Sequence, residues 1–107
     1  MANALLDLPK TARKGEVIKI TTLVSHLMET GYRREISGAV IPRLIIHTFT
    51  CRYDGEEVFR AELFPAMAAN PLIAFSTIAT KSGPISFTWV DDAGITLTES
   101  VDLVVTD

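Results

Sequence analysis

The segment 44–64 constrains the fold of this chain more than any other, because it has the pattern of a β-hairpin. Its first half is rich in β-branched and aromatic residues, which favour strands. Asp54-Gly55 suits a two-residue turn, since glycine accepts the positive φ that such turns need. Alternation places one apolar set on a single face: Ile45, Phe49, Cys51 and Tyr53. That face must be covered by a second layer, so the segment predicts a sandwich of two sheets.

The rest of the chain supplies the other strands. Strand patterns occupy residues 16–24, 72–80, 85–90 and 95–105, and residues 4–8 fit either a short edge strand or a partner-docking arm. Residues 64–71 favour one short helical turn, and Trp89 is expected at the centre of the core. We therefore expect an all-β, immunoglobulin-like (fibronectin-like) β-sandwich of about seven strands, formed by a single domain over residues 1–107.

Residues 26–43 interrupt this strand rhythm with a long connection. Loops of such length without regular structure are usually functional or disordered. The apolar residues within it argue against disorder, so we expect an ordered loop or extended hairpin that lies over one end or edge of the sandwich. Two interpretations stay open, a lid on the protein's own core and a docking surface for a partner.

Charge and hydropathy exclude several classes of protein. A net charge of −3 argues against general binding to nucleic acid or to anionic membranes. No apolar run approaches the ~20 residues that a transmembrane helix needs. The first 15 residues lack a hydrophobic signal core, so we expect a protein that is cytosolic, already processed, or exported on a partner.

The potential metal ligands are few. His26, His47 and Cys51 are the soft or borderline candidates. His47 and Cys51 are four residues apart on one expected strand, roughly 13 Å along it. Ligands of one ion lie only ~4 Å apart, so the pair is not expected to share a metal. This argues against the iron-holding reductases of immunoglobulin-like fold, and we expect no metal and no cofactor.

Catalytic patterns are equally sparse. Ser25 and His26 are adjacent, and adjacent residues of a strand face opposite ways. No nucleophile elbow and no glycine-rich phosphate loop occurs in the sequence. Asp91-Asp92 precedes Gly94 and is better explained by turn chemistry than by acid–base catalysis. The residues alone therefore indicate a β-sandwich that binds something and is not an enzyme.

Several segments, taken in order along the chain, resemble the SoxZ family, the smaller subunit of the SoxYZ sulfur-carrier complex of thiosulfate oxidation. The segments are 14–18, 25–34, 40–43, 49–51, 65–71 and 87–92. One departure is Leu27, where the family usually has proline. The change loses a fixed φ but removes no reactive group.

This resemblance implies an immunoglobulin-like sandwich that forms a tight heterodimer with a SoxY-like subunit. In the family, SoxY carries sulfur intermediates on a cysteine near its flexible carboxy-terminal end. The pair makes transient contacts with the enzymes of the Sox pathway, and the smaller subunit performs no bond chemistry. The expected location is the periplasm, reached by export with a Tat-targeted partner. The alternative from another class is a stand-alone immunoglobulin-like binding or adhesion module with no sulfur role.

The same resemblance implies partner contacts in two regions, the long loop and the corner at Asn70 and Pro71. For each residue, packing on the protein's own core is an open alternative. Cys51 is either a small buried hydrophobe or, since many relatives have a cysteine there, a thiol that forms an interchain disulfide. The candidate interface residues are Met28, Glu29, Thr30, Gly31, Arg33, Ile41, Pro42, Arg43, Asn70 and Pro71.

Overall fold

A computed structural model describes residues 3–65 and 69–107, and within these ranges the regular elements are strands. The all-β prediction is confirmed, with eight strands against about seven expected. The predicted helical turn at 64–71 falls mainly on residues 66–68, which lie outside the described ranges. The strands are β1 (Ala4–Asp7), β2 (Thr11–Arg13), β3 (Val17–Val24), β4 (Ile46–Tyr53), β5 (Glu56–Glu62), β6 (Leu72–Ile78), β7 (Gly83–Asp91) and β8 (Thr96–Thr106).

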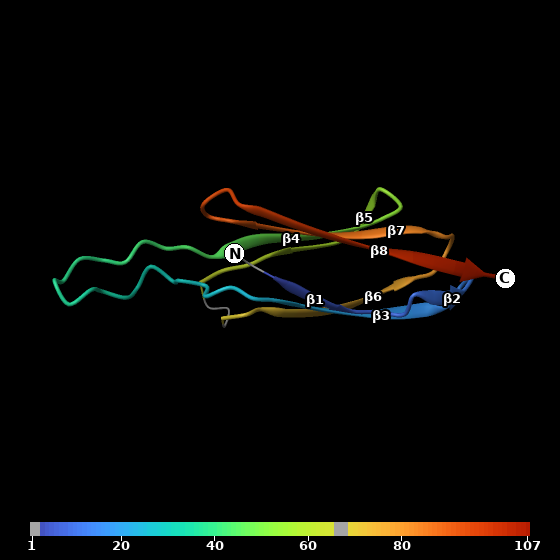
Figure 1. Cartoon of the computed structure of the whole chain (residues 1–107), viewed down its shortest axis with the longest axis horizontal. Helices are drawn as coiled ribbons and strands as arrows, with labels where there is room; N and C mark the ends of the chain where they lie inside the picture. Colours follow the sequence, from blue (N-terminus) through green and yellow to red (C-terminus); the bar gives the residue numbers. More distant parts are fainter. Residues whose placement is uncertain (1–2, 66–68) are drawn as a thin grey trace.

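Two sheets stack as the layers of a sandwich (Figure 1). One sheet has the strand order β1-β3-β6, and the other has the order β2-β8-β7-β4-β5. Neighbouring strands are antiparallel, except that β2 runs parallel to β8. In the part of the chain that the structure describes, no helix is long and apolar enough to cross a membrane.

The hairpin of β4 and β5 forms where the sequence predicts it. Asp54 and Gly55 make the turn, with φ values of 50° and 85°. The predicted inner face is confirmed, because Phe49, Cys51 and Tyr53 are all buried. The return strand contains a bulge between the partners of Cys51 and Arg52, which shifts the register by one residue.

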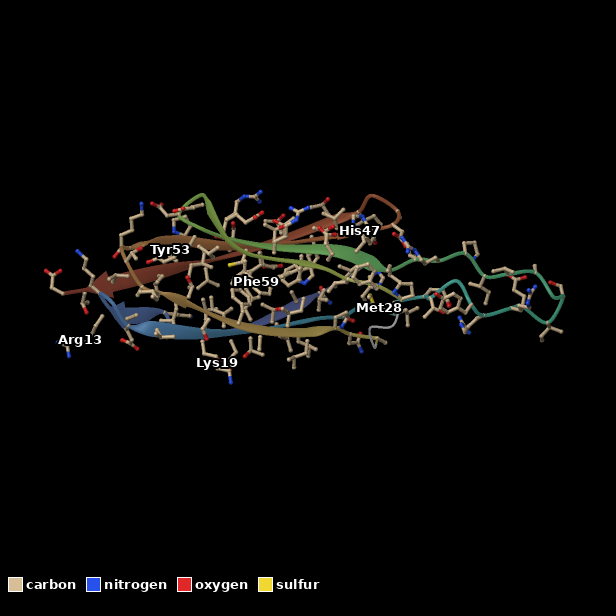
Figure 2. The ribbon with its side chains drawn as sticks, turned by 180° about the vertical axis from the view of Figure 1, so that it is seen from behind. Arg13, Lys19, Met28, His47, Tyr53 and Phe59 are labelled. Atoms are coloured by element: carbon tan, nitrogen blue, oxygen red, sulfur yellow. The ribbon has the colours of Figure 1, made fainter. Side chains whose placement is uncertain are left out.

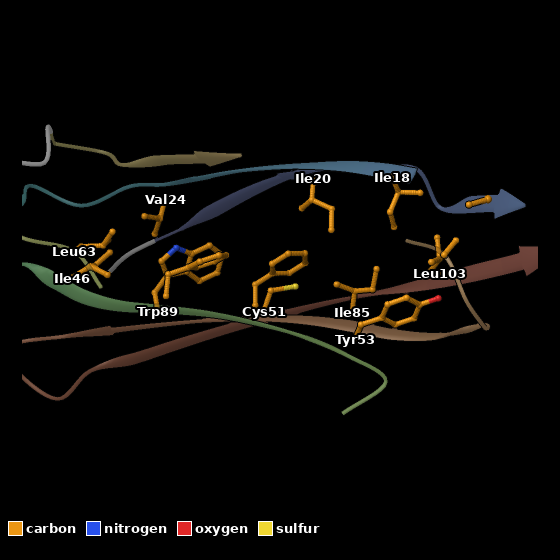
Figure 3. Packing of buried hydrophobic residues seen from close by; sticks show 14 of the residues in the cluster. Ile18, Ile20, Val24, Ile46, Cys51, Tyr53, Leu63, Ile85, Trp89 and Leu103 are labelled. Carbon is orange, nitrogen blue, oxygen red and sulfur yellow. The ribbon is translucent and has the colours of Figure 1, made fainter. Parts of the chain in front are cut away.

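Aromatic side chains fill the middle of the core between the two sheets (Figure 3). Trp89 is only 2% exposed, as predicted, and its ring centroid lies 5.2 Å from that of Phe49. Phe49 also packs against Phe59 and Phe75, both at 6.0 Å. Because these rings come from β4, β5, β6 and β7, the aromatic cluster joins the two layers.

The long connection is an extended hairpin, which is one of the two forms expected. It does not lie over the sandwich, however, and instead projects from one end of it (Figure 1). The chain consequently measures 62 × 20 × 19 Å. The expected position was wrong because the hairpin's two arms pair mainly with each other, through bridges between Glu29 and Leu44 and between Arg34 and Val40.

The outward faces of the two sheets differ in chemistry. On the three-stranded sheet, Leu5 lies opposite Leu23, and Leu23 lies opposite Leu72; we call these three the leucine row. On the five-stranded sheet, the register aligns Thr50 with Thr88 and Thr88 with Thr98, which we call the threonine row. Cross-strand partners share one face, so each row is a line of side chains across its sheet.

Candidate functional site: the long hairpin and the cleft at its base

The two arms of the long hairpin, residues 25–45, are held by a small number of backbone hydrogen bonds. Glu29 and Leu44 exchange two of them, each 2.8 Å long. Nearer the tip, the amide of Ile41 donates to the carbonyl of Arg33 at 2.9 Å. The side chains of Tyr32, just before this bond, and of Ile36, beyond it at the tip, are exposed. The hairpin is thus ordered by its own pairing and presents apolar side chains to solvent.

An ion pair fixes the return arm of the hairpin to the sandwich. Arg43 donates from Nε and Nη2 to the two carboxylate oxygens of Asp92, both at 2.8 Å. The amide of Ile45 donates to the same carboxylate at 3.0 Å. The hydrogen bond from Arg43 is the main cause that lowers the pKa of Asp92 below its usual value. Asp92 therefore remains ionised and anchors the hairpin at neutral pH.

The outgoing arm carries a second ion pair, between Glu29 and Arg33, which are four residues apart in sequence. Its hydrogen bond lowers the pKa of Glu29 and raises that of Arg33. Between these residues, Gly31 has a φ of +87°, and a Cβ there would lie 3.0 Å from Cβ of Arg43. Glycine suits this point because it accepts the positive φ without strain and because a Cβ would press on the side chain of Arg43.

Met28 lies at the base of the hairpin, where its side chain enters the core (Figure 2). Its sulfur accepts a hydrogen bond from the amide of Ile46 at 3.3 Å. The backbone at this residue has a positive φ of 54°. Of the two interpretations left open for Met28, the structure shows packing on the protein's own core.

His26, Asn70 and Asp91 join three segments beside Met28. The amide of His26 donates to Oδ1 of Asn70 at 2.8 Å, and the amide of Asn70 donates to the carbonyl of His26 at 2.7 Å. Nδ1 of His26 accepts from the amide of Met28 at 2.9 Å, while Nε2 lies 3.7 Å from Oδ2 of Asp91. Both ring nitrogens are turned to partners other than Ser25, which is consistent with the argument against a Ser-His pair.

Asp91 also confirms the turn chemistry predicted for the Asp-Asp pair. Its Oδ1 accepts from the amides of Ala93 and Ile95, at 2.9 and 3.0 Å. A carboxylate bonded to backbone amides two and four residues ahead stabilises a turn. The carboxylate therefore has a structural role in closing the connection between β7 and β8.

These groups border a cleft of about 600 Å³ at the hairpin's base. Its chemistry is mixed, since apolar side chains surround the polar groups already paired with one another. The carboxylates of Glu29 and Asp91 make it a poor receptor for an anion. It is better suited to a peptide segment with apolar side chains and backbone donors. The lining residues are Ser25, His26, Leu27, Glu29, Leu44, Asn70, Asp91, Ile95, Thr96 and Leu97.

The three candidate metal ligands lie in separate environments. His26 is engaged as described above, and Nδ1 of His47 lies 2.7 Å from Oγ1 of Thr48. The register of β4 shifts between Ile46 and Thr48, so His47 occupies a bulge and does not continue the alternation assumed for it. Among residues 3–65 and 69–107, no group of three or more His, Cys, Asp or Glu side chains is placed to hold a metal ion.

Cys51 is buried in the core, with 0% of its surface exposed (Figure 3). Burial raises the pKa of its thiol to about 12. A partner's cysteine can reach this sulfur only if the sheets separate. Of the two interpretations, the structure therefore favours the small buried hydrophobe over the interchain disulfide.

The remaining candidate interface residues divide by exposure. Pro71 is buried like Met28, and Glu29, Thr30, Gly31 and Ile41 are half-buried in the hairpin. Arg33, Pro42, Arg43 and Asn70 are exposed. The structure brings all of them to one end of the molecule, and their contact with a partner stays a prediction.

Sequence reasoning missed two features of this end. The contact between His26 and Asp91 joins residues far apart in sequence, and no local sequence pattern predicts it. The leucine row was also missed, although its signal was present: Leu5 and Leu72 each occupy outward positions of strands. A test of both faces of each strand for apolar residues would have found it.

Comparison with known proteins gives a family and a fold. A family model described as sulphur oxidation protein SoxZ matches residues 6–102. No curated protein sequence matches the chain significantly. A solved superoxide reductase (neelaredoxin) from Ignicoccus hospitalis is 14% identical, with a TM-score of 0.76 over 96% of this chain and 80% of that one. The sulfur carrier protein SoxY from Chlorobium limicola f thiosulfatophilum is 12% identical, with a TM-score of 0.68 over 97% and 79% of the two chains.

At such identities the likeness shows the fold alone, and it confirms the predicted immunoglobulin-like sandwich. The family match is of another kind, because it covers nearly the whole sequence and coincides with the segments that carried the resemblance. On that match, the chain belongs to the SoxZ family of sulfur-oxidation proteins.

Proposed function

We propose that this chain is the non-catalytic subunit of a SoxYZ-type heterodimer. In this role it scaffolds and presents the cysteine-bound sulfur intermediates of a SoxY-like subunit to the enzymes of the thiosulfate-oxidising (Sox) pathway. The observation that carries the proposal is the SoxZ family match over residues 6–102. Members of the family are generally non-catalytic carrier subunits, and membership implies pairing with SoxY. We propose the periplasm as the location of the pair, in keeping with the family resemblance.

The geometry supports a scaffolding role in two ways. The sandwich has an aromatic core, and a hairpin projects from one end of it (Figure 1). The two arms of this hairpin are paired with each other. The polar groups at the hairpin's base are engaged in holding segments together, so they have little capacity left for acid–base chemistry. A rigid body with an extended arm suits a subunit that positions another protein.

The alternative, an adhesion or carbohydrate-binding module, would need an exposed aromatic platform. Trp89 does not provide one, since it lies in the core. This observation favours the carrier-complex proposal over the alternative.

The test is reconstitution with the SoxY-like chain encoded by the same genome. Each protein is purified alone, mixed at micromolar concentration, and analysed by size-exclusion chromatography with light scattering. The proposal expects one peak with the mass of a one-to-one complex. Two separate peaks at the masses of the free chains would refute it. Mass spectrometry then follows sulfur adducts on the partner's cysteine, which should be transferred by pathway enzymes efficiently only when this chain is present.

A further inference from the structure

The outward face of the three-stranded sheet is unusually apolar. Leu5 and Leu72, the two outer members of the leucine row, are 71% and 60% exposed. At the opposite end of the same face, Val17 lies across from Ile78, and they are 64% and 53% exposed. A sheet whose outer face meets water normally alternates between apolar inside and polar outside. Here the outward positions break that rule at both ends of the sheet.

Few charges interrupt this surface. Among the outward positions of β1, β3 and β6, Asp7 and Lys19 are the charged ones, and Lys19 points away from the core (Figure 2). The other outward residues between the two apolar ends are small or hydroxylated: Thr21, Ala74 and Ser76. Depletion of charge around exposed aliphatic side chains is typical of the centre of a protein–protein interface.

The leucine row lies at the end of the sheet from which the hairpin leaves. Leu23 precedes Val24, the last residue of β3, and Leu72 follows the corner formed by Asn70 and Pro71. That corner is bonded to His26 at the hairpin's base. Leu27, at the base of the hairpin, is also exposed. The row is therefore continuous with the region in which the sequence placed the partner contacts.

The size of the face agrees with a partner rather than with a small ligand. The strands β1, β3 and β6 have 4, 8 and 7 residues. At ~3.3 Å per residue and about 4.8 Å between strands, the sheet spans roughly 300 Å². A stable complex buries about 800 Å² on each partner, so the sheet would supply roughly two fifths and the adjoining hairpin the rest.

We propose that the SoxY-like partner covers this face, with the leucine row at the centre of the contact and the hairpin alongside the partner. The inference rests on the proposed function, which names the partner. The SoxY of known structure has a sandwich of the same fold over 97% of this chain, so a sheet-bearing body is available to pack on the row. On the opposite face, Thr98 of the threonine row is exposed, Thr88 is half-buried and Thr50 is buried.

The test compares a charge placed in each row. Leu72→Asp puts a carboxylate at the centre of the proposed contact, and Thr98→Asp puts one at an exposed position of the threonine row. Affinity for the purified SoxY-like chain is measured by calorimetry. Leu72→Asp should weaken binding at least about 100-fold, because a central apolar contact is lost and a charge is left without water. Thr98→Asp should change the dissociation constant less than about threefold.

Circular dichroism and thermal unfolding of the free variants check their folding, and the double variant Leu5→Thr/Leu72→Thr replaces Leu72→Asp if that chain does not fold. If the leucine variants bind the SoxY-like chain with the affinity of the wild type, the proposed docking face is wrong, while the proposed function stands. Failure of the wild type to bind would instead overturn the proposed function. Sedimentation of the free chain as a dimer that Leu72→Asp dissociates would assign the face to a second copy, and this would also refute the inference.

Discussion

The leucine row and the threonine row are lines of three residues on the two outward faces of one sandwich, yet their chemistry is opposite. Thr88 and Thr98 approach each other through their hydroxyl oxygens at 3.4 Å, and Arg60 of β5 lies opposite Thr50. The leucine row has aliphatic side chains at the corresponding outward positions of the other sheet. Both rows satisfy the demands of a strand, so folding alone does not explain the difference. The leucine row is exposed in the isolated chain, and its apolar character is explained by a partner that covers it in the complex.

The two faces lie on opposite sides of a single core, and the largest effect should come from a change within that core. Phe49→Ala should lower the free energy of unfolding by about 3–5 kcal/mol, because a buried ring that contacts Phe59, Phe75 and Trp89 is lost. Urea unfolding monitored by Trp89 fluorescence measures it. Val104→Ala on the five-stranded sheet is the control, with a change below about 0.5 kcal/mol. A loss under about 1 kcal/mol for Phe49→Ala would contradict the assigned core.

The next effect concerns the ion pair that anchors the return arm of the hairpin to the sandwich. Asp92→Asn should cost about 1 kcal/mol, since Arg43 loses an ionised partner that is only partly solvated. The pKa of Asp92 is lowered in the folded protein, so its stabilisation is present above the usual pKa of 3.8 and is lost as the pH falls through the folded value. Unfolding of wild type and variant between about pH 7 and pH 2 should therefore converge at the acid end. A constant difference across that range would argue against the ion pair.

A smaller effect on stability separates the leucine row from the core. Leu5→Thr/Leu72→Thr should change the free energy of unfolding by less than about 1 kcal/mol, because both side chains are exposed in the free chain and threonine suits a strand. Hydrophobic-interaction chromatography should show earlier elution of this variant. Val104→Thr, on the other outward face, is the matched control and should elute much closer to wild type. Equal shifts for the two variants would remove the distinction between the faces.

The smallest effect is expected beside the threonine row. Arg60 lies 3.1 Å from Glu62 and 3.6 Å from Glu57, and all three side chains are well solvated. Arg60→Ala should therefore change the free energy of unfolding by at most about 0.5 kcal/mol. Chemical denaturation at low and at high salt checks this. A cost above about 1 kcal/mol that disappears in salt would show that this face depends on its charges.

The strands whose apolar and polar residues alternate were predictable from the sequence. The hairpin of β4 and β5 follows from alternation and from Asp54-Gly55, and Trp89 is buried as its strand phase indicates. β2 was not predicted, because its three residues show no period and its pairing with β8 joins distant parts of the chain. The strand expected over residues 95–105 forms as β8 (Thr96–Thr106), which passes Glu99 and Ser100 without a break.

The candidate site was predicted less well than the fold. The long loop was identified as an ordered element, but Met28 was placed among the interface residues although its side chain belongs to the core. Met28 has a positive φ in this structure, and a non-glycine residue gives no signal of such a φ in sequence. The leucine row is not expected from alternation, which predicts one apolar face per strand, because both faces of this sheet carry apolar residues.

Hydroxyl-radical footprinting of the free chain and of its complex with the SoxY-like subunit tests the central claim most directly. It reports the solvent access of individual aliphatic side chains, and each face offers exposed ones for comparison. Oxidation of Leu5, Leu72 and Val17 should fall strongly in the complex, while that of Val104 on the five-stranded sheet should stay as in the free chain. Protection of Val104 with unchanged oxidation of the leucine row would contradict the account.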